Sequence, residues 1–155
     1  MEIKLPKLKK LDNTTPTKKK KKILLLSDDF RLPSGIGTIS KEIILNTVKE
    51  YDWIQLGAAL KHPDHGKGVD ISLDVQKETG INDASVKVIP WTGYGEKPDA
   101  ILHFTDPRYW TWLYQLEHEI KTTYGTPIMY YSIWDDLPYP MWNAPFYGSC
   151  DLIMG

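Results

Sequence analysis

The sequence predicts an α/β fold with a mainly parallel sheet and helices on both faces, and three observations indicate it. Residues 23–26 form a continuous apolar run of the kind that is buried on both sides in a parallel sheet. Residues 38–51 carry apolar side chains at helical spacing. Strand-like and helix-like segments then alternate along the chain, as in proteins that build parallel sheets through crossover connections.

The expected elements follow this alternation in chain order. Strands are expected at residues 23–28, 53–58, 71–73, 86–89, 100–104, 127–133 and 151–154. Helices are expected at residues 38–51, between Asp106 and Gly125, and at residues 141–147, with a polar helix or turn at residues 75–79. The second helix has the clearest ends, because Asp106 is a suitable N-cap, Pro107 fits the first turn and Gly125 can terminate it.

Charge is divided unevenly along the chain. Residues 1–22 carry nine lysines against Glu2 and Asp12, a net charge of about +7, so residues 23–155 carry about −8. We expect a flexible Lys-rich tail at residues 1–22 and one Rossmann-like domain at residues 23–155. The acidic domain argues against nucleic-acid binding. The run Lys18–Lys22 could contact an anionic membrane, but a solubilising leader is the simpler interpretation.

The single cysteine bears on the compartment. Cys150 cannot form an internal disulfide, which fits a reducing environment. The longest apolar run is far too short to span a bilayer, and no signal-peptide pattern follows Met1. We therefore expect a cytoplasmic protein.

The loop at residues 28–37 is the first candidate site, because ligands of doubly wound sheets bind beyond the carboxyl ends of the strands. After Ser34, Gly35 and Gly37 allow close approach of the backbone to a ligand, and the helix that follows offers free N–H groups to an anion. The loop has neither the three glycines of the dinucleotide fingerprint nor the Gly-Lys-Ser/Thr of a phosphate-binding loop. A tight turn is the alternative interpretation.

Two later strand ends carry carboxylates. Asp106 follows the strand that contains His103; it either caps the next helix or binds a hydroxyl-rich ligand, whereas His103 is expected in the core or on the sheet face. Trp134, Asp135 and Asp136 follow the next strand. Aromatic rings stack on sugar faces and carboxylates accept sugar hydroxyls, so this pattern suits carbohydrate. Adjacent side chains point apart, so the two carboxylates are not expected to act as a pair.

Other chemistries have little support. His62, Asp64 and His65 match no standard zinc spacing, so we predict no metal site and a mobile surface loop there. The chain lacks a Gly-X-Ser-X-Gly elbow, and Cys150 has no evident histidine partner. Both observations argue against hydrolase chemistry.

Taken in order, these motifs resemble the N-terminal domain of family-4, GT-B-type glycosyltransferases, including those of tailed bacteriophages. The Gly-Gly-Ile-Gly loop of that family is similar to Ser34-Gly35-Ile36-Gly37. Residues 98–103, Pro-Asp-Ala-Ile-Leu-His, and the Asp106-Pro107 pair are similar to its next motifs. Its Thr-Ile-His-Asp compares with residues 132–135, and its Ala-Asp-Leu-Ile compares with residues 150–153. The resemblance spans residues 23–155.

The resemblance implies a fold, the Rossmann-like N-terminal half of a GT-B enzyme. It also implies an activity, the transfer of a hexosyl group from a nucleotide-sugar co-substrate to a sugar or glycan acceptor. It implies no metal and no other cofactor. By position, Gly35, Ile36 and Gly37 would lie against the donor phosphates and the acceptor. The further binding candidates are Ser34, His103, Trp134 and Asp136, and the catalytic candidates are Asp106 and Asp135. Trp134 stands where the family commonly has a histidine, so the role of that histidine is not carried over.

The same resemblance implies a donor-binding domain after Gly155, in the same or another chain. Without that domain, the chain is expected to bind acceptor weakly and donor poorly, and to show no turnover alone. Two alternatives stay open. One is a non-catalytic carbohydrate-binding or assembly module that keeps the fold; the other is a flavodoxin-like domain for a phosphate-bearing small molecule.

Overall fold

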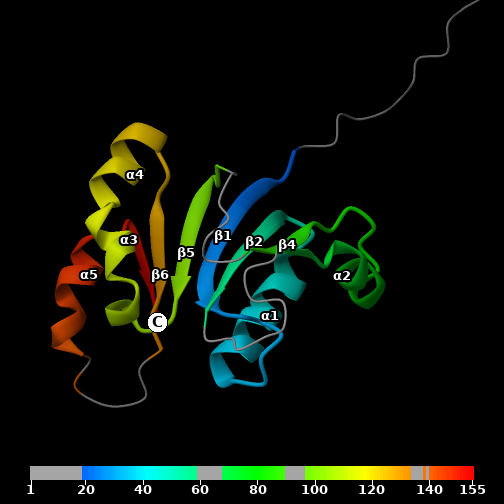
Figure 1. Ribbon diagram of the computed structural model, residues 1–155, viewed down its shortest axis with the longest axis horizontal. Coiled ribbons are helices and arrows are strands. Elements are labelled where there is room, and N and C mark those ends of the chain that lie inside the picture. Colours follow the sequence, from blue (N-terminus) through cyan, green and yellow to red (C-terminus); the bar gives the residue numbers. More distant parts are fainter. Residues whose placement is uncertain (1–18, 59–67, 90–96, 134–137, 139) are drawn as a thin grey trace, which may run out of the picture.

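A seven-stranded sheet forms the centre of the structure (Figure 1), a computed structural model that describes residues 19–58, 68–89, 97–133, 138 and 140–155. The strands are β1 (Lys21–Asp28), β2 (Tyr51–Ala58), β3 (Val69–Asp70), β4 (Val86–Ile89), β5 (Ala100–Phe104), β6 (Ile128–Tyr131) and β7 (Leu152–Met154). They lie in the order β3-β4-β2-β1-β5-β6-β7, and all neighbours are parallel except β3 and β4. The predicted Rossmann-like α/β fold is confirmed.

The strand order defines where a ligand is expected. From β1 the chain moves outward through β2 to β4, and then crosses to the other side of β1 to add β5, β6 and β7. If the antiparallel β3 is left out, this is the 3-2-1-4-5-6 order of doubly wound sheets. The winding reverses between β1 and β5, so a crevice is expected beyond the carboxyl ends of these two strands.

Helices cover both faces of the sheet (Figure 1). They are α1 (Gly35–Thr47), α2 (Ser72–Thr79), α3 (Thr111–Gln115), α4 (Glu117–Tyr124) and α5 (Ala144–Gly148), with short 3-10 helices η1 (Pro107–Tyr109) and η2 (Met141–Asn143). On one face, Ile44 of α1 shares an apolar core with Leu25 of β1. On the other face, Leu113 of α3 shares a second core with Leu24 and Leu26. Alternate residues of β1 therefore enter opposite cores, as the continuous apolar run predicts.

The strand expected at residues 71–73 is wrong, because that segment starts α2. Asp70 ends the short strand β3, and its side chain accepts a hydrogen bond from the Ser72 N–H at 3.0 Å. This turn directs the chain into a helix. Leu73 is 70% exposed on the surface of this helix.

The helix expected between Asp106 and Gly125 is divided into η1, α3 and α4. Its ends are confirmed: the Asp106 side chain accepts from the Arg108 N–H, and Gly125 terminates α4 with a φ of 62°. The interior differs, because Leu116 separates α3 from α4 with a backbone that is not helical. Within this interrupted segment Tyr109 and Leu116 are exposed.

Three lysines of the expected tail belong to the domain. Lys21 and Lys22 begin β1, and the Lys20 ammonium donates to the Val48 carbonyl at 2.9 Å and forms an ion pair with Asp83. A cation at this position satisfies a carbonyl at the end of α1 and complements the helix dipole. Residues 1–18 lie outside the described residues. Within the described part of the chain, no helix has both the length and the apolar character needed to cross a membrane.

Candidate functional site

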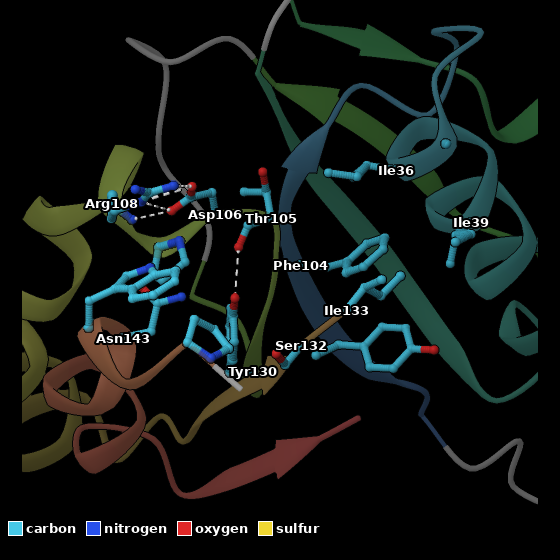
Figure 2. Close-up of a pocket in the computed structure, with 15 residues that line it drawn as sticks. Ile36, Ile39, Phe104, Thr105, Asp106, Arg108, Tyr130, Ser132, Ile133 and Asn143 are labelled. Atoms are coloured by element: carbon cyan, nitrogen blue, oxygen red, sulfur yellow. Dashed lines mark hydrogen bonds and ion pairs between the residues drawn. The ribbon is translucent and has the colours of Figure 1, made fainter. Parts of the chain in front are cut away.

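A cleft of about 330 Å³ lies at the reversal point of the sheet (Figure 2). Its walls come from the first turns of α1, from the residues that end and follow β5, from the end of β6 and from η2. These segments are far apart in the sequence, and the parallel topology brings them to one edge of the sheet. The volume lies at the lower end of the range for small-molecule sites.

The glycine loop forms one wall of the cleft. Ser34 caps α1, since its Oγ accepts from the Gly37 N–H at 3.0 Å, and the helix therefore begins at Gly35 rather than at residue 38. Gly35 and Ile36 line the cleft. The first N–H groups of a helix have no acceptor within the helix, so this wall can bind an anion or a hydroxyl oxygen.

The two glycines of this loop have different surroundings. A Cβ added at Gly35 would meet no atom within 4 Å, whereas a Cβ at Gly37 would lie 2.6 Å from the Leu32 carbonyl oxygen. Gly37 is therefore required for packing of the loop against the helix. Gly35 is not required for packing, and its missing side chain leaves space in the cleft.

A buried polar network that was not predicted from the sequence holds the start of this loop. Gln55 of β2 accepts from the Phe30 N–H at 3.0 Å and donates to Ser27 Oγ and to the Asp28 carbonyl, both at 2.8 Å. Ser40 of α1 donates to the same Ser27 Oγ at 3.0 Å. The available signal was the presence of Ser27 and Gln55 inside otherwise apolar strands.

The two adjacent carboxylates at the end of β1, Asp28 and Asp29, lie in different environments. Asp29 is 1% exposed and forms a bidentate pair with Arg31, at 2.9 Å to Nε and 2.7 Å to Nη2. Gly57 makes room for it, because a Cβ there would lie 2.9 Å from the Asp29 side chain. Burial raises the pKa of Asp28, and a hydrogen bond from Ser34 offsets part of that rise. Asp29 is thus a structural anchor of the loop.

Asp106, one of the two predicted catalytic candidates, lines the cleft. Its carboxylate caps η1 and pairs with Arg108, whose Nε lies 3.0 Å from both carboxylate oxygens. Hydrogen bonds from Arg108 hold the pKa of Asp106 below its usual range. Asp106 is therefore ionised at neutral pH, which suits it to accept hydrogen bonds from a ligand.

His103 is not brought to the cleft. It is fully buried in β5, where its Nδ1 lies 2.6 Å from Tyr114 Oη and its ring packs against Trp110 and Tyr130. The prediction of a core histidine is confirmed, and its ring supports Tyr130, which does line the cleft. Burial lowers the pKa of His103 to about 3, so the ring is neutral at physiological pH.

The buried His103 is expected to make stability depend on pH. The pKa falls from 6.5 in the unfolded chain to about 3 in the fold, so protons bind preferentially to the unfolded state. The resulting stability is complete above pH 6.5 and is lost as the pH falls toward 3, by up to about 1.4 kcal/mol per pH unit. Denaturant unfolding between pH 7 and pH 5 should show this loss in the wild type and a smaller loss in His103→Gln. Equal slopes in the two proteins would contradict this account of His103.

Part of the predicted site lies outside the described residues. This applies to Trp134, Asp135 and Asp136, and also to the loop with His62 and His65. The described neighbours Ile133 and Pro140 both line the cleft. Among the described residues, no group of three or more potential metal ligands lies together.

The η2 wall was not foreseen from the sequence. Trp142 and Asn143 both line the cleft; Trp142 is 56% exposed, whereas Asn143 is only 5% exposed. The Asn143 Oδ1 atom is buried and has no hydrogen-bond partner among the described residues. The sequence predicted a short helix here, but only the tertiary fold shows that its first turn faces β5 and α1.

No protein-family model matches the chain, and no curated protein matches it at a significant level. What the cleft can bind therefore follows from its side chains. It combines the N-terminus of a helix, an ionised carboxylate paired with a guanidinium, an exposed indole and a buried amide carbonyl. This set is suited to a neutral or anionic ligand that carries hydroxyl groups.

Proposed function

We propose that the chain is the acceptor-side domain of a glycosyltransferase, which moves a hexosyl group from a nucleotide sugar to an acceptor. The observation that carries the proposal is the meeting of Gly35, Asp106 and Trp142 in one cleft at the reversal point of a doubly wound sheet. The glycine loop and the Asp106-Pro107 motif carry the resemblance to family-4 enzymes. Trp142 adds an aromatic surface that suits a sugar ring.

Each wall has a role in this proposal. The N–H groups at Gly35 and Ile36 bind the diphosphate of the donor, because a helix N-terminus favours negative charge. Asp106 accepts a hydrogen bond from an acceptor hydroxyl and orients it toward the sugar that is transferred. A donor-binding domain, in the same or another chain, holds the nucleotide on the opposite side. The reaction takes place in the cytoplasm.

Binding of simple glycosides tests the proposal. The expected result is weak binding of at least one methyl hexoside, with amide chemical-shift changes in NMR spectra at Gly35, Asp106 and Trp142. Asp106→Asn should weaken this binding about tenfold, because it replaces a charged acceptor with a neutral one. Folding should persist, because asparagine is also a good N-cap.

The control is Asp74→Asn, since Asp74 is an exposed carboxylate on α2 and does not line the cleft. It should leave glycoside binding unchanged. The proposal would be wrong if neither a panel of methyl hexosides nor a panel of nucleotide sugars shifted any resonance of the cleft.

A non-catalytic carbohydrate-binding module is the second candidate, and one observation favours it. Of the predicted site residues that the structure describes, Asp106 has a pKa below its usual range and His103 has a pKa of about 3. Neither is poised to exchange a proton at neutral pH. Transfer assays on the complete gene product discriminate the two functions: turnover that Asp106→Asn reduces supports the enzyme, and glycoside binding with no turnover for any donor supports the module.

A further inference from the structure

The cleft has a polar half and an apolar half (Figure 2). Asp106, Arg108 and Asn143 lie on one side, and the side chains of Ile36 and Ile39 lie on the other. Phe104 and Ile133 extend the apolar half across the floor. Ile133 is 50% exposed and Ile36 and Ile39 are half-buried, so apolar surface is still available for a ligand to cover.

Asn143 supplies an independent sign of a ligand in the polar half. The residue is only 5% exposed, and its Oδ1 has no hydrogen-bond partner within the described part of the chain. A buried carbonyl oxygen without a donor is costly, and such groups in folded proteins are normally paired. Oδ1 itself is buried, but Asn143 lines the cleft, so a rotation of its side chain toward the cleft would let a hydroxyl or N–H group of a bound molecule donate to Oδ1.

We infer that the acceptor is amphipathic, a hydroxylated head group joined to an alkyl or aryl group. This inference rests on the proposed function, since it names the substrate class of the same cleft. The head group lies between Asp106 and Asn143, where one of its hydroxyls donates to the Asn143 Oδ1. The apolar group lies against Ile36, Ile39 and Ile133 and removes their exposed surface from water.

Simpler ligands satisfy only one half of the cleft. A free sugar would place hydroxyl groups against the isoleucine side chains, where they would lose hydrogen bonds to water without replacement. A hydrocarbon would leave the Asn143 carbonyl unpaired. An amphipathic glycoside meets both requirements in one molecule.

The test uses the 155-residue chain and matched pairs of ligands. Methyl and hexyl β-glycosides of glucose, galactose and mannose, together with 1-hexanol, are titrated by calorimetry and NMR. For at least one sugar, the hexyl glycoside should bind at least about tenfold more tightly than the methyl glycoside, because the alkyl chain buries several methylene groups. Both should bind more tightly in the wild type than in Asn143→Leu.

Two serine variants separate the apolar contact from general effects. Ile133→Ser should reduce the ratio of hexyl to methyl glycoside affinity several-fold. Leu73→Ser removes an exposed leucine of α2 outside the cleft and should leave the ratio unchanged. Because both leucine and isoleucine are exposed at these positions, neither substitution should prevent folding.

The outcomes distinguish this inference from the proposed function. If methyl glycosides bind in the cleft and the ratio is near one for every sugar, the amphipathic acceptor is wrong and the carbohydrate function stands. If 1-hexanol binds as tightly as the hexyl glycosides and no methyl glycoside binds, both are wrong. The inference is also wrong if no ligand in the panel binds.

Discussion

Gly37→Ala is expected to lower the free energy of unfolding by about 3 kcal/mol, whereas Gly35→Ala should change it by less than about 0.5 kcal/mol. The new Cβ at Gly37 would lie 2.6 Å from the Leu32 carbonyl oxygen and 3.0 Å from that of Asp29. Both are backbone atoms of a loop held by buried hydrogen bonds, so they cannot move aside at low cost. A Cβ at Gly35 meets nothing within 4 Å.

For ligand binding we expect Gly35 to be the more sensitive position, although it is the less sensitive one for stability. Gly35→Val places two methyl groups into the cleft and is expected to weaken glycoside or nucleotide-sugar binding at least tenfold, with the fold intact. Chemical denaturation measures stability, and NMR titration measures binding. If Gly35→Val lost stability as Gly37→Ala does, both glycines would serve a tight turn and the loop would have no separate role in binding.

Gln55→Leu is expected to cost about 3 kcal/mol of folding free energy, although leucine is similar in size and Gln55 is fully buried. The substitution removes three hydrogen bonds, to the Phe30 N–H, to Ser27 Oγ and to the Asp28 carbonyl. The Phe30 N–H is buried, so no water replaces the lost acceptor without opening the loop. In Gln55→Leu the glycine loop should therefore become less ordered, and the cleft should bind glycosides less tightly.

A graded series checks this interpretation. Ser40→Ala removes a single bond to Ser27 and should cost about 1 kcal/mol. Gln115→Leu, at an exposed position of α3, should have little effect on stability or binding. Hydrogen exchange at the Phe30 amide reports on the loop directly, and protection as strong in Gln55→Leu as in the wild type would contradict the role given to this network.

The features that were predicted from the sequence are those with local causes. The burial of β1 follows from a run of apolar residues, and the cap at Asp106 and the stop at Gly125 follow from residue type and spacing. The parallel sheet follows from the alternation of elements. The placement of Gly35 and Asp106 in one cleft follows from the rule that carboxyl ends of parallel strands share an edge.

The features that were missed depend on partners distant in the sequence. Gln55 acquires its role from Phe30 and Ser27, which are 25 and 28 residues away. The segment with Leu73 starts a helix because Asp70 turns the chain, whereas a strand was expected there. Asn143 lines the cleft only because the segment after β6 packs beside the residues that follow β5, and no local sequence pattern predicts this packing.

The position of β1 at the centre of the sheet has a consequence for the order of events during synthesis. Its partner β2 begins 30 residues after β1 does. The hydrogen bond from the Lys22 N–H to the Asp99 side chain, just before β5, joins residues that are 77 positions apart. Chains fold from the N-terminus as they emerge, and distant pairings form late. The unit of β1, α1 and β2 therefore assembles first, with one edge of an apolar strand uncovered. Until β5 emerges, that edge is the part of the nascent chain most exposed to aggregation, and the arrival of β5 both covers the edge and adds a second wall to the cleft.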